Sequence, residues 1–190
     1  MVEKNKSNPV ISMTCPPAPL TPLTVSYGAG VNSTAMLIGF LSRGIRPDLI
    51  LFANPGSEKS PTYGYISVIT EWLKKAGFPR LTIVRYQVRK FKYGPYRTIG
   101  ENCIRNATLP SLAFGRKACS MKWKAAPQNA FCEGWEPAIR AWRTGLKVRK
   151  AIGFDYGPKD SLRYAVAGDR DDEKYEYIIP CVNGPRAMHP

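Results

Sequence analysis

The sequence lacks the features that would place the chain in a membrane or in a secreted disulfide scaffold. No apolar run approaches the roughly 18 residues that cross a bilayer. The first ten residues, MVEKNKSNPV, contain no apolar core of a signal peptide. The five cysteines are an odd number and are irregularly spaced, whereas disulfide scaffolds use even sets. We therefore expect a protein of the reducing cytoplasm that makes no membrane contact.

Histidine is nearly absent, which argues against two kinds of site. The single histidine, His189, is the penultimate residue, so neither histidine acid–base catalysis nor a histidine-rich metal centre is expected. The thiolates of Cys103, Cys119, Cys132 and Cys181 would suffice in number for an iron–sulfur cluster. None of them is paired as Cys-x-x-Cys, and free cysteines commonly act as small apolar core residues. We therefore predict no metal ligands and no iron–sulfur cluster.

Acidic residues are scarce in the middle of the chain. The chain carries 28 basic and 14 acidic residues, and residues 74–150 hold eighteen of the basic and only three of the acidic ones. Aromatic rings are interleaved with these cations, a combination suited to RNA or DNA because cations neutralise phosphates and rings stack on bases. The alternatives are a solubilising surface, or one that serves only the phosphates of a nucleotide. The candidate nucleic-acid contacts are Arg89, Lys90, Lys92, Arg97, Arg116, Lys117, Trp123 and Lys124.

The order of apolar and polar segments predicts one domain preceded by an arm. Residues 1–22 contain five prolines and little periodicity, which is typical of a flexible arm. Residues 23–190 then form a single domain, with a basic excursion at about 89–147. A hydrophobic content of 44% supplies enough apolar surface for a core.

Buried strands alternate with amphipathic helices along this domain. The expected strands are 23–28, 48–54, 81–88, 148–155 and 175–182. The expected helices are 32–44 and 61–77, with 120–145 helical in pieces that break at Pro127 and Pro137, and 91–115 irregular. This alternation predicts an α/β, Rossmann-like fold, with a mostly parallel sheet and helices on both of its faces.

The segment VSYGAGVNSTAML (25–37) predicts a phosphate-binding turn. A buried strand passes through a glycine-spaced turn into a helix, so backbone N–H groups and the positive end of the helix can face an anion. The turn matches neither GxxxxGK[ST] nor GxGxxG, and the alternative is a glycine-rich turn without a ligand. The predicted contacts are Ser26, Tyr27, Gly28, Ala29, Gly30, Val31, Asn32, Ser33 and Thr34.

At these residues the chain resembles the PP-loop family of ATP pyrophosphatases, which share the adenine nucleotide alpha-hydrolase fold. It looks most like the phosphoadenosine phosphosulfate reductase-like branch, which includes phage and bacterial members. The family signature, SGGxDS, ends at Ser33 here, and Ser26 matches an upstream serine of the branch. Asn32 stands where the family has aspartate. An amide can cap a helix and bind phosphate, but it cannot hold Mg²⁺ as a carboxylate does.

Three later segments resemble the same branch, in the same order. FANPGSEKSPTYGYI (52–66) is similar to its second-strand motif, which implies adenosine contacts from Asn54, Gly56 and Glu58. RKACSMKWKAAP (116–127) resembles its Arg–Cys–Ser/Thr–Lys segment. AIGFDYGPKDSLR (151–163) resembles its fourth-strand motif, which adds Gly153 and Asp155 as nucleotide contacts and Arg163 as a functional residue.

The resemblance implies an enzyme that uses ATP and Mg²⁺. An acceptor would attack the α-phosphate and become adenylated, in sulfur transfer or nucleic-acid modification, and the residues implied for catalysis are Asn32, Ser33, Cys119, Lys122 and Arg163. Basic neighbours of Cys119 favour its thiolate. Each basic residue considered singly is also explained as a solvated surface charge.

Two other hypotheses remain open. Asn32 and the altered second motif fit a catalytically degenerate module that binds nucleotide or nucleic acid, with a protein partner or a second copy completing the site. The chain ends in MHP without the Glu-Cys-Gly motif that reductases of the branch carry. A sulfonucleotide reductase of this type would therefore need its cysteine in trans.

Overall fold

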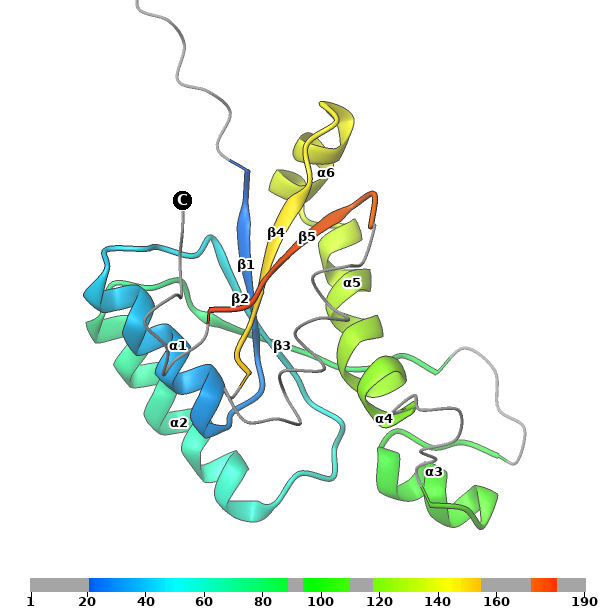
Figure 1. The fold of residues 1–190 in the computed structure, drawn as a ribbon. Helices are drawn as coiled ribbons and strands as arrows, with labels where there is room; N and C mark the ends of the chain where they lie inside the picture. The colour runs from blue at the N-terminus through cyan, green and yellow to red at the C-terminus, as the bar shows by residue number, and fades with distance from the viewer. Residues whose placement is uncertain (1–20, 89–93, 110–117, 155–171, 181–190) are drawn as a thin grey trace, which may run out of the picture.

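The strands form one parallel sheet that is wound in both directions from its centre. The computed structural model describes residues 21–88, 94–109, 118–154 and 172–180. Every neighbouring pair is parallel, and the strand order is β3-β2-β1-β4-β5 (Figure 1). The strands are β1 (Leu23–Tyr27), β2 (Leu49–Ala53), β3 (Leu81–Val84), β4 (Val148–Ile152) and β5 (Tyr175–Ile178). The α/β, Rossmann-like class predicted from the sequence is confirmed.

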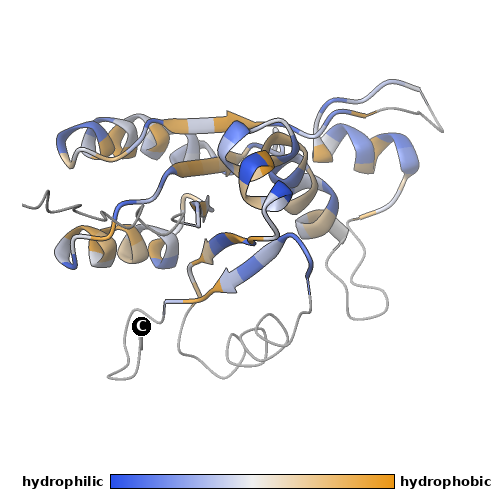
Figure 2. Ribbon diagram, turned by 90° about the horizontal axis from the view of Figure 1, so that it is seen from above, coloured by the Kyte–Doolittle hydropathy of each residue, from blue (hydrophilic) through white to orange (hydrophobic). Residues whose placement is uncertain are grey.

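Helices cover both faces of the sheet, as the wholly apolar strand β2 requires. Helices α1 (Val31–Ser42) and α2 (Ser60–Lys75) lie on one side, and α5 (Ala126–Glu133) and α6 (Glu136–Arg143) lie on the other (Figure 1). Ile50 and Phe52 pack in the cluster of α1 and α2, whereas Leu49 and Leu51 pack in the cluster of α5 and α6. Figure 2 shows the apolar residues along the strands, between the helices.

Helices α1 and α2 end where the sequence predicts. Pro61 lies in the first turn of α2, where its missing N–H costs nothing. Gly44 and Gly77 follow the two helices with a φ of +68° each, the left-handed conformation that closes a helix and favours glycine.

The segment 91–115, expected to be irregular, contains helix α3 (Ile99–Asn106). The Thr98 hydroxyl accepts a hydrogen bond from the Glu101 N–H (3.1 Å), and the Glu101 carboxylate accepts one from the Thr98 N–H (3.4 Å). This reciprocal capping box satisfies two backbone donors at the helix start. The pattern Thr-x-x-Glu in the sequence indicates a helix start, whereas the nearby glycines and prolines favour irregular structure.

The helical break expected at Pro127 is also wrong. Helix α4 (Ala118–Ser120), the π-helical stretch η2 (Met121–Ala125) and α5 follow one another directly. Proline has no N–H to donate four residues back, and the backbone changes register just before Pro127, where the Ala126 N–H bonds to the Met121 carbonyl. The break expected at Pro137 is confirmed, since Pro137 lies at the start of α6.

The predicted arm ends slightly earlier than expected. The Pro22 carbonyl accepts a hydrogen bond from the Arg149 N–H (2.9 Å), so Pro22 already belongs to the edge where β1 meets β4. Residues 1–20 lie outside the described residues. Within the described ranges, no helix combines the length and the apolar character needed to cross a membrane.

Candidate functional site

A cavity of about 660 Å³ opens at the carboxyl ends of the central strands. From β1 the chain runs outward to β2 and β3, then returns to the other side of β1 to form β4 and β5. Parallel α/β sheets bind ligands at this reversal of strand order, and the volume is that of a small-ligand site. The predicted site residues that line it are Ser26, Tyr27, Gly28, Gly30, Val31, Asn32, Ser33, Lys124 and Gly153.

Ser33 holds the glycine-rich turn together. Its Oγ lies 3.3 Å from the N–H groups of Gly28 and of Gly30, from which it accepts hydrogen bonds, and it donates to the Gly30 carbonyl (3.0 Å). The side chain is only 6% exposed. Ser33 therefore shapes the turn, while Gly30 caps α1 with an extended backbone.

Thr34 and Tyr27 brace the same turn from the α1 side. The Thr34 hydroxyl donates to the Gly30 carbonyl (3.0 Å) and lies 3.1 Å from the Tyr27 hydroxyl. The Tyr27 ring is packed in the apolar cluster under α1, and this burial raises the pKa of its hydroxyl. Thr34 is not among the cavity-lining residues. Thr34 and Tyr27 therefore help to hold the backbone of the glycine-rich turn in position.

Ala29 is strained and Gly153 is required by close packing. Ala29 has a φ of +55°, a conformation that costs an L-residue energy and that glycine adopts freely. A Cβ on Gly153 would lie 2.7 Å from the Asn32 carbonyl oxygen and 2.8 Å from the Ser33 Cα. The end of β4 thus abuts the glycine-rich turn, and two segments predicted separately meet at one point.

Asn54 and Gly56, two of the predicted adenosine contacts, build the turn after β2. The Asn54 Oδ1 accepts hydrogen bonds from the Gly56 N–H (2.8 Å) and the Tyr63 hydroxyl (3.0 Å). Gly56 has a φ of +76°, and a Cβ there would lie 2.8 Å from the Thr98 Cβ. Neither residue lines the cavity, and Glu58 does not either.

Glu58 forms an ion pair with Lys124, a residue that does line the cavity. The Lys124 Nζ lies 2.7 Å from the Glu58 Oε1, and the two side chains are 44% and 22% exposed. Lys124 lines the cavity from η2, so this pair ties the turn after β2 to the helix on the opposite side of the cavity. Such a half-exposed pair adds little stability by itself.

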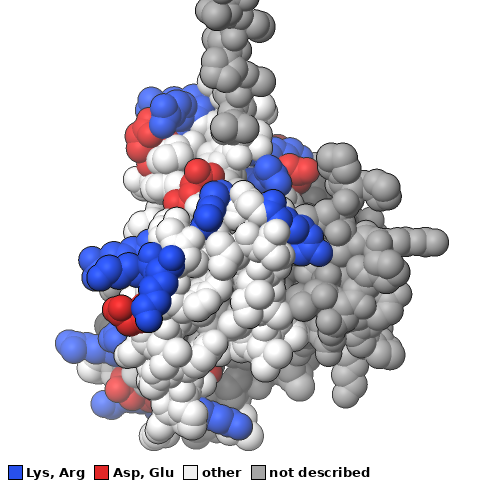
Figure 3. All heavy atoms as spheres, turned by 90° about the vertical axis from the view of Figure 1, so that its left-hand side faces the viewer, with Lys and Arg blue, Asp and Glu red and all other residues white. Residues whose placement is uncertain are grey.

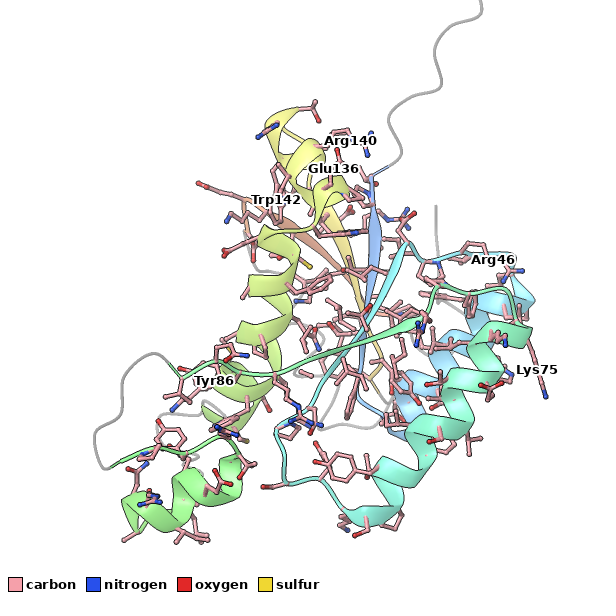
Figure 4. All side chains as sticks on the ribbon, turned by 180° about the vertical axis from the view of Figure 1, so that it is seen from behind. Arg46, Lys75, Tyr86, Glu136, Arg140 and Trp142 are labelled. Atoms are coloured by element: carbon pink, nitrogen blue, oxygen red, sulfur yellow. The ribbon has the colours of Figure 1, made fainter. Side chains whose placement is uncertain are left out.

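Lys122 and Trp123 lie among aromatic side chains and outside the described lining of the cavity. The Lys122 ammonium lies 5.3 Å from the ring centres of Tyr86 and Tyr96 and 5.6 Å from that of Trp123, and it donates to the Tyr96 hydroxyl (3.2 Å). Lys122 does not line the cavity. Trp123 is 3% exposed, and its ring centre is 5.2 Å from that of Tyr86, whose position at the start of the segment after β3 is labelled in Figure 4. A base cannot stack on a ring that other side chains already cover.

A polar floor, missed by sequence reasoning, lies on the α5 side of the sheet. Lys150 is 4% exposed, and its ammonium donates to the Asn129 Oδ1 (2.6 Å). Burial lowers the pKa of Lys150 to about 8, and the negative charges of the nearby Cys132 and Asp172 partly offset this by raising the pKa. The available signal was a lysine at a position of VRKAI (148–152) that alternation places on the same face as Val148 and Ile152.

The described cysteines have different surroundings and do not form a cluster. Cys103 and Cys119 are partly exposed, whereas Cys132 is buried between α5 and the sheet, and this burial raises the pKa of its thiol. Across the described ranges, no three His, Cys, Asp or Glu side chains are grouped to hold a metal ion. The predicted residues that fall outside the described ranges are Arg89, Lys90, Lys92, Arg116, Lys117, Asp155, Arg163 and Cys181.

Among the described residues, basic side chains lie in separate groups, and some of them are paired with acidic ones. On the face formed by α1 and α2, Lys and Arg lie toward the edges and the centre is uncharged (Figure 3). On α6, Arg140 is paired with Glu136 at 2.6 Å (Figure 4). Among the predicted contacts that are described, Arg97 is exposed and Lys124 is half exposed.

Comparison of the chain with protein-family models, with curated proteins and with solved structures found no match. The resemblance to the PP-loop family therefore stays a prediction, and the functional argument depends on the geometry of the site.

Proposed function

We propose that this protein binds an adenine nucleotide in the cavity at the carboxyl ends of β1 and β4 and transfers its AMP group to an acceptor. The observation that carries the proposal is the position of the glycine-rich turn and of the α1 N-terminus on the wall of this cavity. Lys150 and Lys124, the latter paired with Glu58, also line the cavity, and none of its described lining residues is acidic. A cavity with this charge suits phosphate groups.

The start of α1 supplies the donors for phosphate. The first bond within the helix is from the Thr34 N–H to the Gly30 carbonyl (3.1 Å), so the N–H groups of residues 31–33 have no acceptor inside the helix. The helix dipole adds positive potential there. Ser33 and Gly153 keep this turn in place, because one bonds its backbone and the other allows β4 to approach it.

In adenylyl transfer the protein forms no covalent bond itself, and its role is to position the reactants and stabilise charge. An acceptor oxygen forms a bond to the α-phosphorus, the bond from that phosphorus to the bridging oxygen breaks, and pyrophosphate leaves with the electron pair. The charge that develops is stabilised by backbone N–H groups and ammonium groups held in position. The described lining residues include no carboxylate that would hold Mg²⁺, and no step here depends on this ion.

The lack of an acidic side chain in the described lining also supports a second candidate function, a module that binds nucleotide without cleaving it. Asn32→Asp separates the two functions, because it introduces the carboxylate that Mg²⁺ prefers. A large gain in pyrophosphate release would indicate a binding module with a decayed site. A loss of release would identify Asn32 as a working residue of an enzyme.

The proposed function is tested by incubating the pure protein with Mg²⁺ and α-labelled ATP, alone or with tRNA, single-stranded DNA or duplex DNA. We expect AMP and pyrophosphate to form, faster with one nucleic acid, or labelled AMP to be attached to that acceptor. If ATP binds but stays intact in every tube, the binding module replaces the enzyme. If ATP does not bind, both candidate functions are overturned.

A further inference from the structure

Four polar side chains form the floor of the cavity on the α5 side of the sheet. Ser26 and Lys150 come from adjacent strands, and Gln128 and Asn129 come from α5. Ser26 donates to the Gln128 Oε1 (2.6 Å), and Lys150 donates to the Asn129 Oδ1 (2.6 Å). Gln128, Asn129 and Lys150 lie outside the glycine-rich turn, and Ser26 lies in β1 just before it.

Lys150 is a buried cation that forms no ion pair with a described carboxylate. It is 4% exposed, its ammonium donates to a neutral amide, and it lies 4.9 Å from the centre of the Tyr175 ring. Asp172 and the Cys132 thiol act on it electrostatically without pairing with it. An ammonium has three donors, and one of them has an acceptor among the described residues. A buried charge is unfavourable unless it is paired, so this position is stabilised when an anion enters the cavity.

We propose that Lys150, aimed by Asn129, is the anion-binding residue of a second subsite, which takes an oxyanion (a phosphate or carboxylate group) on the cavity floor. The proposal rests on the proposed function in placing the ligand in this cavity. The oxyanion has two possible sources, a phosphate of the nucleotide itself or an anionic group of the acceptor, and the two are distinguished by whether the subsite still binds an anion when ATP is present.

The experiment measures binding by calorimetry for the wild-type protein and for Lys150→Met, which removes the charge and keeps an unbranched apolar chain. The probes are inorganic phosphate, pyrophosphate, acetate, AMP, ATP and GTP, each alone, and then phosphate and acetate added to ATP-saturated protein. Lys75→Met is the matched control, since Lys75 is exposed at the end of α2, away from the cavity (Figure 4). Lys150→Gln is the second variant, and thermal melting shows that each variant is folded.

We expect Lys150→Met to weaken at least one oxyanion probe tenfold or more and to leave the melting temperature unchanged or higher. If ATP and pyrophosphate are the probes affected, the nucleotide supplies the oxyanion. If phosphate or acetate binds beside ATP and this binding is lost in the variant, the acceptor supplies it. The proposal is overturned if both Lys150 variants bind every probe as the wild type does, or if the wild type binds none of the probes.

The pH dependence of oxyanion affinity distinguishes a lysine that binds the anion from one that only supports the structure. Wild-type affinity for the oxyanion is expected to fall as pH rises from 7 to 9.5, because the Lys150 amine loses its proton, and this fall is absent in Lys150→Met. The other titratable groups facing the floor are Cys132 from α5, Tyr175 and Tyr177 from β5, Asp172 and, from η2, Lys124. They remain in both proteins, so the difference between the two reports Lys150 together with its coupling to Cys132 and Asp172.

The same data separate failure of the subsite from failure of the proposed function. If pyrophosphate binding depends on Lys150 but ATP binds no better than GTP or pyrophosphate, the adenine-nucleotide function fails and the subsite stands. If Lys150→Met binds and cleaves ATP as the wild type does and no oxyanion probe is affected, the function stands and the subsite fails.

Discussion

Individual residues of the glycine-rich turn mostly determine its shape. Ser33 bonds two backbone N–H groups, and Thr34 bonds the Gly30 carbonyl. Ala29 occupies a left-handed conformation, and Gly153 leaves room for Asn32. The contacts left for a ligand are therefore backbone N–H groups, whose positions these side chains maintain.

Ala29→Gly is expected to stabilise the protein. Left-handed backbone costs an L-residue roughly 1–2 kcal/mol, and glycine returns part of this gain through the entropy of the unfolded chain, leaving about 0.5–1 kcal/mol. Urea denaturation measures the change in the free energy of unfolding. Ala35→Gly, inside α1, is the control and should destabilise by about 1 kcal/mol. A loss of stability in Ala29→Gly equal to that of the control would contradict the assignment of strain.

Gly153→Ala is expected to destabilise the protein by about 1–3 kcal/mol, because the new methyl group must push the turn away from β4. Affinity for ATP should fall as well, since the turn carries the phosphate donors. Denaturation and calorimetry measure the two effects. Gly64→Ala in α2 is the control, because a Cβ there meets nothing within 4 Å and should stabilise the helix. Unchanged ATP affinity in Gly153→Ala would remove the turn from the binding site.

Elements rather than single residues place the opposite wall of the cavity. Helices α4, η2 and α5 form one path, and the residues that face the cavity from it recur at helical spacing. They are Ser120, Met121, Lys124, Ala125, Gln128 and Asn129. Helix α3 adjoins the turn after β2, with the Gly100 N–H donating to the Ser57 hydroxyl (3.0 Å). The arrangement of this wall thus depends on η2 leading directly into α5, which contains Pro127 near its start.

Thr98→Ala is expected to cost about 1 kcal/mol of stability, because it removes the acceptor for the Glu101 N–H at the start of α3. Urea denaturation measures the loss. Thr98→Ser keeps the hydroxyl and should retain most of the capping contribution. Thr108→Ala, at an exposed position after the helix, should change little. Equal stability of the Thr98→Ala and Thr98→Ser variants would show that the capping box contributes nothing.

At the scale of the whole molecule, the sheet buries a positive charge next to its apolar core. Val148 and Lys150 point to the same side of β4, where Val148 packs with α6 and Lys150 faces the cavity. Net charge is +14 for the full chain, so the protein already repels itself. The fold therefore places the ammonium of Lys150 inside the protein, where water does not screen its repulsion from the other cations.

This burial predicts how stability depends on pH. Below pH 8 Lys150 is charged in both folded and unfolded chains, and the folded state carries the full desolvation cost. Between the folded pKa of about 8 and the ordinary value of 10.5, the unfolded chain binds more protons, so stability rises with pH. Relative to Lys150→Met, the wild-type free energy of unfolding should gain roughly 3 kcal/mol between pH 7.5 and 10.5.

Urea denaturation of the two proteins across this pH range measures that gain. The Cys132 thiol is present in both proteins, and because Lys150 lowers its pKa, the difference reports Lys150 together with its coupling to Cys132. A difference that stays constant with pH would mean that the pKa of Lys150 is not lowered in the folded protein.

The strand and helix pattern was readable from the sequence because it depends on local periodicity. Apolar runs and their glycine boundaries located all five strands and the first two helices to within a few residues. The glycine-spaced turn was also recognised, since a strand passing directly into a polar helix start is a local signal. The α3 capping box and the register change at Pro127 were local as well, but other glycine and proline signals competed with them.

Only the tertiary structure decided which side chains share the cavity. Lys150 and Asn129 are 21 residues apart and Ser26 and Gln128 are 102 apart, and no local pattern pairs them. Lys122 and Lys124 look alike in the sequence, yet one lies among three aromatic rings and the other lines the cavity. The alternation of apolar residues determined the layers of this protein, whereas the site depends on strand order and helix register, which arise when distant segments pack together.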